Sequence, residues 1–432
     1  MSLLFLDLHK ERQKQLRMSF LDFCIIALFI MFNANVASFL GNDVFVVFIF
    51  IILLVIFFLK NKKIDKELFW LLGAWIVINI ISSFVNFKQA FSIVSFCGVT
   101  LRMLMPYFMV KIVGRTFWDK FFKFSYVLVL ISSIFWLVES FFPQLIDALV
   151  PYLNFMTQRE QYVNNGFYIF VYMHSGWATD MGLFVRNSGF MWEPGGYACV
   201  LIFLLCYHFC KIDYQVDQKI IILSLVIIST FSTAGYVAIF IVYIVSFVKN
   251  KALWRKYWFL LPFFLFGFIG YAAYFYNTSE FMREKIEGYI EQDKDTYNWE
   301  FEGQRILRVS RWGIIQISIE NALRRPWGEG ICQSEYILQK YGPVEGPSAV
   351  ATILREWGWL GLIVLCLALY NFCINGHKGG WGLLLPMIVV LSSNPFLFKY
   401  FIYAMVFEYI IFNKYKNLKI NKQCQYLKIR SY

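Results

Sequence analysis

One short stretch, residues 186–194, places an arginine and a glutamate seven positions apart in the order Arg-Asn-Ser-Gly-Phe-Met-Trp-Glu-Pro. The planar guanidinium of Arg186 can bind phosphate oxygens through two parallel bonds. The carboxylate of Glu193 can accept a proton from a reacting hydroxyl. Both charges lie at the start of an apolar run, 190–210, that predicts a membrane helix. Lipid does not solvate such charges, so they are expected to face protein, water or a charged ligand. The alternative is a juxtamembrane arginine and a helix-start glutamate stabilised by the helix dipole.

A second group of arginines recurs every three residues at Arg305, Arg308 and Arg311, and Arg324 and Arg325 follow. On a helix, the first three would form one cationic stripe. Apolar spacing predicts an amphipathic helix over residues 308–323. Two interpretations stay open: a membrane-surface helix attracted to anionic headgroups, or a clamp for phosphate oxygens.

Arg102 lies near the middle of a predicted span, 92–111. A charged side chain at that depth is costly, so it marks either a functional site or a tight ion pair. The candidate partners for a structural pair are Glu139 and Glu408.

The composition predicts a membrane protein with many spans. Of 432 residues, 59% are hydrophobic and 20% are aromatic, and the mean hydropathy is +0.57. Soluble domains are nearer about 45–50% apolar. The net charge of +12 is explained by basic cytoplasmic loops and does not require nucleic acid as a partner. The basic N-terminal stretch leads directly into a full-length span, which argues against a cleavable signal peptide.

Apolar runs and basic loops together predict an all-α polytopic protein with about twelve spans and both termini inside. We expect these spans near residues 18–39, 44–59, 68–84, 92–111, 124–142, 190–210, 257–276, 349–372, 381–391 and 400–412, with two short helices inside 220–248.

The chain is expected to form a single integral membrane domain, 1–432, with two long external segments. The first, 143–188, is poor in Lys and Arg. The second, 277–348, joins the ninth and tenth spans, is highly charged and contains the amphipathic helix. Long loops cross a membrane largely regardless of their charge, so the basic residues of the second segment do not overturn this topology.

Several other signals are weak. Asp293-Lys294-Asp295 has the Asp-x-Asp form of metal-dependent sugar-nucleotide transferases, but a solvated loop is the expected reading. His174 is likewise expected to be solvated. The sequence has no dinucleotide, phosphate-loop or nucleophile-elbow motif, and no His or Cys group with zinc-ligand spacing. We therefore expect no metal and no cofactor, and a donor that arrives already activated.

Three segments, in this order, resemble the bacterial O-antigen polymerase and O-antigen ligase family. Residues 186–194 are similar to its Arg-x-x-Gly-x-x-x-Glu-Pro segment. Residues 310–330 resemble its loop helix, which starts with Arg and ends in Pro-x-Gly-x-Gly. Residues 354–361 resemble its Leu-x-Glu-x-Gly-x-x-Gly helix, and 230–236 resemble its short paired helices.

The resemblance implies a GT-C-like membrane glycosyltransferase fold. It implies a donor glycan linked to undecaprenyl diphosphate, used at the external (periplasmic) face of the bacterial inner membrane without metal or nucleotide. Ligases of the family carry a His-Asn pair ahead of the third motif, where this chain has Pro347 and Ser348. This departure favours a polymerase over a ligase.

The resulting hypothesis is polymerisation of repeat units of O-antigen, as in lipopolysaccharide, of capsule or of exopolysaccharide, with a flippase and a chain-length regulator as possible partners besides membrane lipid. The expected catalytic residues are Glu193 as base and Arg186 and Arg311 as clamp. The expected substrate-binding residues are Arg102, Arg305, Arg308, Arg324, Arg325 and Glu356. The alternatives are an O-antigen ligase, a transporter or flippase of lipid-linked glycans, for which internal repeats and compact loops would be expected, and a structural scaffold.

Overall fold

The computed structural model describes most of the chain. The described residues are 18–34, 36, 42–85, 92–153, 166–174, 185–278, 283, 297–301, 304–308, 311–331, 337–338, 340, 344–345, 348–374, 381–393 and 400–411. The weak Asp293-Lys294-Asp295 signal and Pro347 lie outside this set.

Helices make up most of the described chain. They are α2 (Phe20–Ala34), α3 (Asp43–Leu59), α4 (Lys66–Val85), α5 (Ile93–Val113), α6 (Phe117–Phe141), α7 (Pro143–Asp147), α8 (Val150–Leu153), α10 (Pro194–Lys211), α11 (Gln218–Ser229), α12 (Thr233–Lys249), α13 (Lys251–Tyr257), α14 (Leu261–Thr278), α16 (Arg311–Arg324), α18 (Ala349–Ile374) and α19 (Trp381–Ser392). A 3-10 turn, η3 (Trp258–Leu260), joins α13 to α14, and a last apolar helix covers Tyr400–Ile411. The strands are β1 (Phe167–Ile169), β2 (Tyr172–His174), β3 (Tyr297–Phe301), β4 (Gln304–Arg308) and β5 (Val344–Glu345).

The helices have the length and surface of a membrane-embedded protein. Within the described residues, α4, α5, α6, α10 and α18 are long and apolar enough to cross a bilayer, and shorter apolar helices occupy other expected spans. Large apolar side chains lie exposed on outward faces, such as Phe48 at 57%, Ile134 at 61% and Trp70 at 81%. A water-soluble protein rarely exposes such continuous apolar surface, whereas lipid covers it without cost.

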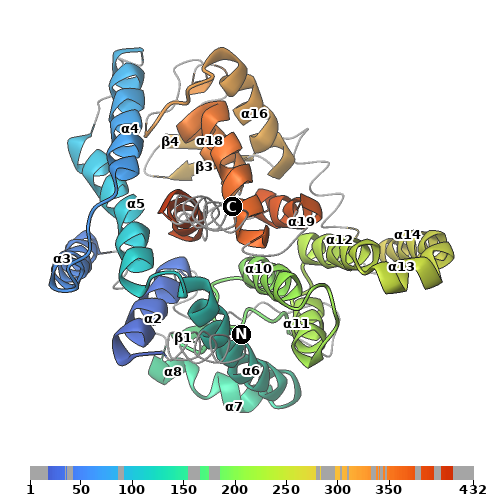
Figure 1. The fold of residues 1–432 in the computed structure, drawn as a ribbon. Coiled ribbons are helices and arrows are strands. Elements are labelled where there is room, and N and C mark those ends of the chain that lie inside the picture. Colours follow the sequence, from blue (N-terminus) through green and yellow to red (C-terminus); the bar gives the residue numbers. More distant parts are fainter. Residues whose placement is uncertain are drawn as a thin grey trace, which may run out of the picture.

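Helix α10 lies at the centre of the fold. All its residues except Gly195 and Lys211 are buried, and it packs against α11, α12, α18 and α19. In Figure 1, α2 to α6 lie to one side of it and α11 to α14 to the other. Because α10 begins immediately after Glu193, the central helix of the bundle positions the carboxylate predicted to be catalytic.

The apolar stretch 220–248 is interrupted as the sequence predicts. Helix α11 ends at Ser229 and α12 begins at Thr233. Phe231 has a positive φ of 48°, and the Ser232 hydroxyl accepts a hydrogen bond from the Gly235 amide at 3.3 Å. The expectation of two short helices is confirmed.

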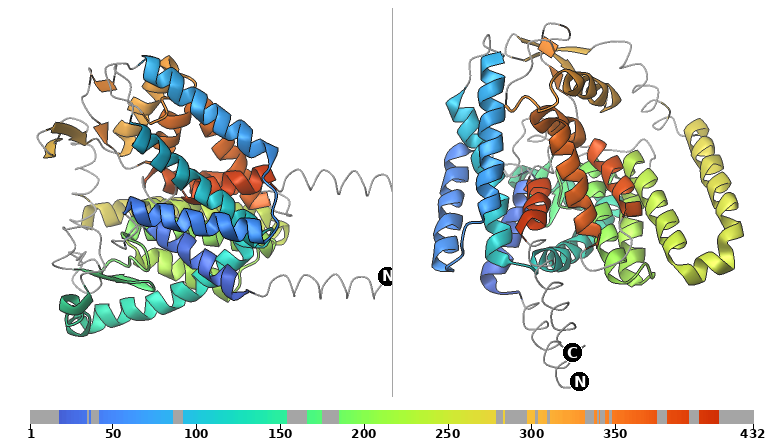
Figure 2. Two further views of the ribbon diagram at one scale, coloured as in Figure 1. Left: turned by 90° about the vertical axis from the view of Figure 1, so that its left-hand side faces the viewer. Right: turned by 45° about the horizontal axis from the view of Figure 1, so that its top comes forward.

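Both segments expected as external loops contain strands, which adds β-structure to the predicted all-α fold. In the first, β1 and β2 form an antiparallel hairpin. In the second, β3 pairs antiparallel with β4, and β4 pairs parallel with β5. Figure 2 (left) shows these strands at the left-hand end of the bundle.

Ion pairs gather at the other end of the bundle. Lys120 binds Asp22 at 2.8 Å, Lys111 pairs with Asp65, and Lys211 pairs with Asp119. These lysines lie close to helix ends, and the sequence predicts that these ends face the cytoplasm. A partly buried charge needs such a partner, because desolvation otherwise costs several kcal/mol.

Candidate functional site

The segment 186–194 is fixed by hydrogen bonds before it enters α10. The Asn187 side chain donates to the Ser229 hydroxyl at 2.8 Å and accepts from the Gly189 amide at 2.9 Å. The Asn187 amide donates to the Ser229 carbonyl at 3.0 Å. Gly189 has a φ of +51°, and a Cβ there would lie 2.2 Å from the Tyr197 ring. Only glycine therefore allows the turn to pack on α10.

Arg186 reaches the turn between α11 and α12. Its Nε donates to the Thr230 carbonyl at 3.4 Å and its Nη2 donates to the Phe231 carbonyl at 3.3 Å. These two bonds fix the orientation of the Arg186 guanidinium at this turn.

Glu193 begins α10 but does not cap it with its carboxylate. Its backbone is extended, with φ −148° and ψ 155°, and its side chain accepts no capping hydrogen bond. Its carbonyl accepts from the Tyr197 amide at 3.0 Å, which starts the helix. Glu193 therefore lies at the N-terminus of α10, as the helix-dipole interpretation also expects, and its carboxylate does not cap the helix.

The charges of Glu193 and Arg311 act on one buried thiol. Cys199, one and a half turns into α10, is fully buried, and its thiol interacts electrostatically with both the Glu193 carboxylate and the Arg311 guanidinium. Arg311 is the first residue of α16. Both charged groups therefore lie within electrostatic range of the same thiol, although they are separated by more than a hundred residues in the sequence.

Arg311 occupies an unfavourable position for a cation unless an anion is nearby. It lies in the first turn of α16, which contains no acidic residue. The N-terminus of a helix carries roughly half a positive charge, so an added cation there is repelled. The same two positive groups together attract an anion such as a phosphate.

The loop after α16 interlocks with a break in α18. Gly358 has φ 63° and ψ −158°, which kinks the helix. The kink frees the carbonyls of residues 355 and 356, which accept from the amides of Glu329 and Gly330 at 2.8 and 3.0 Å. In return the Trp359 amide donates to the Pro326 carbonyl at 3.0 Å. Residues 310–330 and 354–361, two of the three segments that resemble the O-antigen polymerase and ligase family, therefore form one structural unit.

We expect Gly358→Ala to loosen this unit. A Cβ at Gly358 would lie 2.0 Å from the Pro326 carbonyl oxygen, and the residue has a positive φ. Backbone strain of this kind costs about 1–3 kcal/mol, so thermal unfolding of the purified protein should begin several degrees lower. Gly73→Ala is the matched control, because a Cβ at Gly73 meets no atom within 4 Å. Equal unfolding temperatures for the two variants would contradict the interlock.

Arg305 and Arg308 do not belong to the helix, which corrects the predicted cationic stripe. Both lie on β4, where they pair with Glu300 and Tyr297 of β3. The amphipathic helix exists but begins at Arg311. The missed signal is the glycine at 303 between two short runs, a hairpin pattern that the three-residue arginine repeat concealed.

The remaining loop residues lie in different places. Arg324 is exposed at the far end of α16, about 20 Å along the helix from Arg311 at 1.5 Å per residue. Arg325 lies 3.7 Å from the buried carboxylate of Glu329. Glu356 is buried and acts electrostatically on the Tyr403 hydroxyl.

Arg102 forms an ion pair, but with neither of the partners predicted for it. Its Nη2 lies 2.6 Å from Asp43 Oδ1, at the start of α3. Glu408 instead accepts from the Trp118 indole at 2.7 Å. Arg102 is 37% exposed, so its guanidinium lies partly open. The expectation that it pairs with a carboxylate is confirmed, and the partner is a residue near a helix start.

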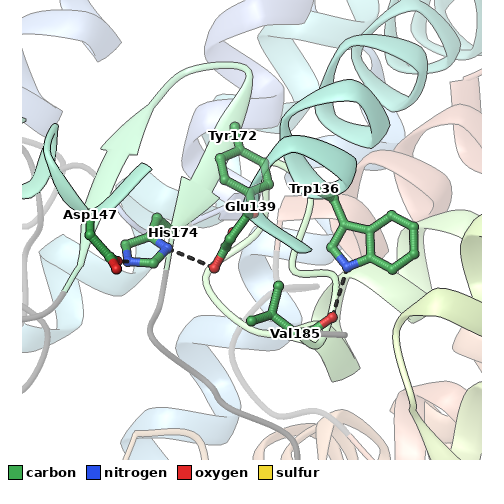
Figure 3. Close-up of polar contacts among 6 residues, drawn as sticks. All are labelled: Trp136, Glu139, Asp147, Tyr172, His174 and Val185. Carbon is green, nitrogen blue, oxygen red and sulfur yellow. Dashed lines mark hydrogen bonds and ion pairs between the residues drawn. The ribbon is translucent and has the colours of Figure 1, made fainter. Parts of the chain in front are cut away.

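His174 is buried in a polar cluster, which corrects the expectation that it is solvated. Its Nδ1 lies 2.8 Å from Glu139 Oε1, and its Nε2 lies 3.7 Å from Asp147 Oδ1. The Tyr172 hydroxyl donates to the other oxygen of Glu139. Figure 3 shows Glu139, at the end of α6, pointing between Tyr172 and His174 of β2.

This cluster braces the segment that carries Arg186. The Met173 amide of β2 donates to the Gly189 carbonyl at 2.6 Å. The Trp136 indole of α6 donates to the Val185 carbonyl at 2.7 Å, as Figure 3 shows. The C-terminal end of α6 therefore holds the segment both directly and through the β1–β2 hairpin. No spacing in the sequence predicts this brace, because its members meet only in the fold.

In comparisons with known proteins, no family model, curated protein or solved structure matches the chain.

Proposed function

We propose that this chain polymerises a bacterial surface polysaccharide by glycosyl transfer between lipid-linked repeat units. The donor is a glycan on undecaprenyl diphosphate, and the acceptor is a sugar hydroxyl of a second lipid-linked unit. The reaction takes place at the external face of the inner membrane, in a GT-C-like arrangement of about twelve spans. The polymer is an O-antigen, a capsule or an exopolysaccharide.

The observation that supports this proposal is that the charges of Glu193 and Arg311 both act on the buried thiol of Cys199. A transfer with a diphosphate leaving group needs a base for the acceptor and a cation for the departing phosphate, both near one anomeric carbon. A carboxylate and a cation that both act on one thiol, with the cation at a helix N-terminus, would supply these two groups. The resemblance of the three segments to the polymerase and ligase family supports the same chemistry.

In the proposed reaction, the acceptor oxygen attacks the anomeric carbon of the donor while its proton passes to Glu193. The bond from that carbon to the diphosphate oxygen breaks, and the electron pair leaves with the diphosphate. Arg311 and the α16 N-terminus stabilise the developing negative charge, as does Arg186 beside the α11–α12 turn. Hydrogen-bond donors held in place where charge develops in the transition state are usually the largest single contribution to catalysis.

Deleting the coding sequence from its bacterium tests this function. We expect the deletion strain to display single repeat units in place of long chains, because donor units still form and cross the membrane. A plasmid copy should restore the chains. Loss of all surface repeat units, with lipid-linked units accumulating inside, would instead indicate a flippase.

A further inference from the structure

An open pocket lies at the basic end of the bundle, away from the site proposed for polymerisation. It has a volume of about 380 Å³, and its polar lining comes from Asp22, Lys60, Arg115, Thr116 and Lys120. These residues come from α2, the end of α3, the α5–α6 connection and the first turns of α6. Small-molecule sites have volumes of about 300–1,000 Å³, so a headgroup-sized ligand fits.

The lining of this pocket is positively charged. Three cations face one carboxylate, for a formal charge of +2. That carboxylate, Asp22, is already bound by the buried Lys120 at 2.8 Å and by the Ser19 amide at 3.1 Å. It therefore does little to neutralise Lys60 and Arg115.

The start of α6 adds to the positive potential. The helix has 25 residues, and its N-cap, Thr116, lines the pocket but makes no side-chain capping bond. The first-turn acid, Asp119, is engaged by Lys211 and by the Tyr207 hydroxyl at 3.0 Å. A long helix with an uncapped N-terminus next to basic side chains is a favourable arrangement for binding phosphate.

We propose that this pocket binds a phosphate-bearing anion at the face of the membrane expected to be cytoplasmic. Arg115 supplies a fork for two phosphate oxygens, and Lys60 supplies a point charge. The source of the phosphate is either the headgroup of an anionic phospholipid or free inorganic phosphate. Basic pockets between membrane helices commonly hold anionic headgroups.

The test titrates purified full-length protein in detergent and counts bound ligand by native mass spectrometry. The probes are dioleoyl phosphatidylglycerol, dioleoyl phosphatidylcholine and inorganic phosphate. Wild-type protein should bind one equivalent of phosphatidylglycerol or of phosphate saturably, in preference to zwitterionic phosphatidylcholine. Lys60→Gln combined with Arg115→Gln should weaken this binding at least about tenfold, because charge-assisted hydrogen bonds are lost.

The matched control is Lys62→Gln combined with Lys63→Gln, which removes the same charge nearby but outside the pocket lining. The control should bind like wild type. Saturable phosphatidylglycerol binding that phosphate does not displace identifies a lipid site, and saturable phosphate binding identifies a free-anion site. Equal losses in both double variants, or none in the first, would overturn the proposal. If the first double variant unfolds, Lys60→Gln and Arg115→Gln are measured singly against Lys62→Gln.

Discussion

Arg311→Lys should reduce polymer formation on the order of 10²-fold while the protein still inserts and folds. Lysine keeps the charge but loses the planar fork that binds two phosphate oxygens, and removal of one aligned donor at developing charge typically costs about 10²–10³-fold. The measurement is the chain-length distribution of surface polysaccharide in cells carrying the variant, with protein level determined in the same cells.

The matched control for this substitution is Arg255→Lys, at an exposed position on α13 near the basic end. It makes the same chemical change far from the thiol of Cys199 and should leave the distribution unchanged. Normal chain lengths from Arg311→Lys at normal protein levels would remove Arg311 from the clamp.

Glu193→Gln should abolish long chains and leave single repeat units on the surface. Glutamine keeps the size of the side chain and most of its hydrogen bonding, but it cannot accept a proton. Loss of a positioned base typically costs about 10²–10⁴-fold in rate. Because the carboxylate makes no capping bond, the start of α10 should form in the variant, and the level of inserted protein is determined in the same cells.

Glu320→Gln provides the comparison for this second variant. Glu320 lies on α16 and pairs with Lys340 at 2.9 Å, where both side chains are partly exposed. Its loss should cost about 1 kcal/mol of stability at most and should not shorten the polymer. Long chains from Glu193→Gln would show that another group accepts the proton.

Much of the membrane core could be predicted from the sequence, because lipid imposes one simple requirement. A spanning segment must be apolar and helical, so the runs near 92–111 and 349–372 give α5 and α18 with bounds shifted by a few residues. The break at Ser232 in the α11–α12 stretch could be predicted for the same reason, since small polar residues interrupt the apolar run.

The site could be predicted only in part, because its partners come from distant segments. Glu139 and His174 lie 35 positions apart in sequence, and their contact at 2.8 Å requires the β1–β2 hairpin to pack against α6. Asp43 pairs with Arg102 across 59 positions. Spacing rules describe neighbours on one element, so they give no information on such pairs.

The interlock of Pro326 and Gly358 illustrates the same limit at the backbone level. Both are visible in the sequence as turn-forming residues, but a helix kink that frees carbonyls for another loop requires both segments to be docked. The sequence predicts the wrong element for Arg305 and Arg308 for a related reason. A three-residue repeat fits a helix locally, while pairing with β3 depends on a strand contributed by the preceding residues.

Reconstitution tests the central claim most directly. The purified protein in liposomes is given a synthetic undecaprenyl-diphosphate-linked repeat unit as the only sugar source, without nucleotide sugar. The products are separated by gel electrophoresis and identified by mass spectrometry. We expect a ladder of lipid-linked oligomers, with one undecaprenyl diphosphate released for each bond formed, and no ladder with Glu193→Gln. Recovery of unchanged single units would contradict the assignment as a polymerase. Movement of the units across the bilayer with no glycosidic bond formed between them would contradict it as well.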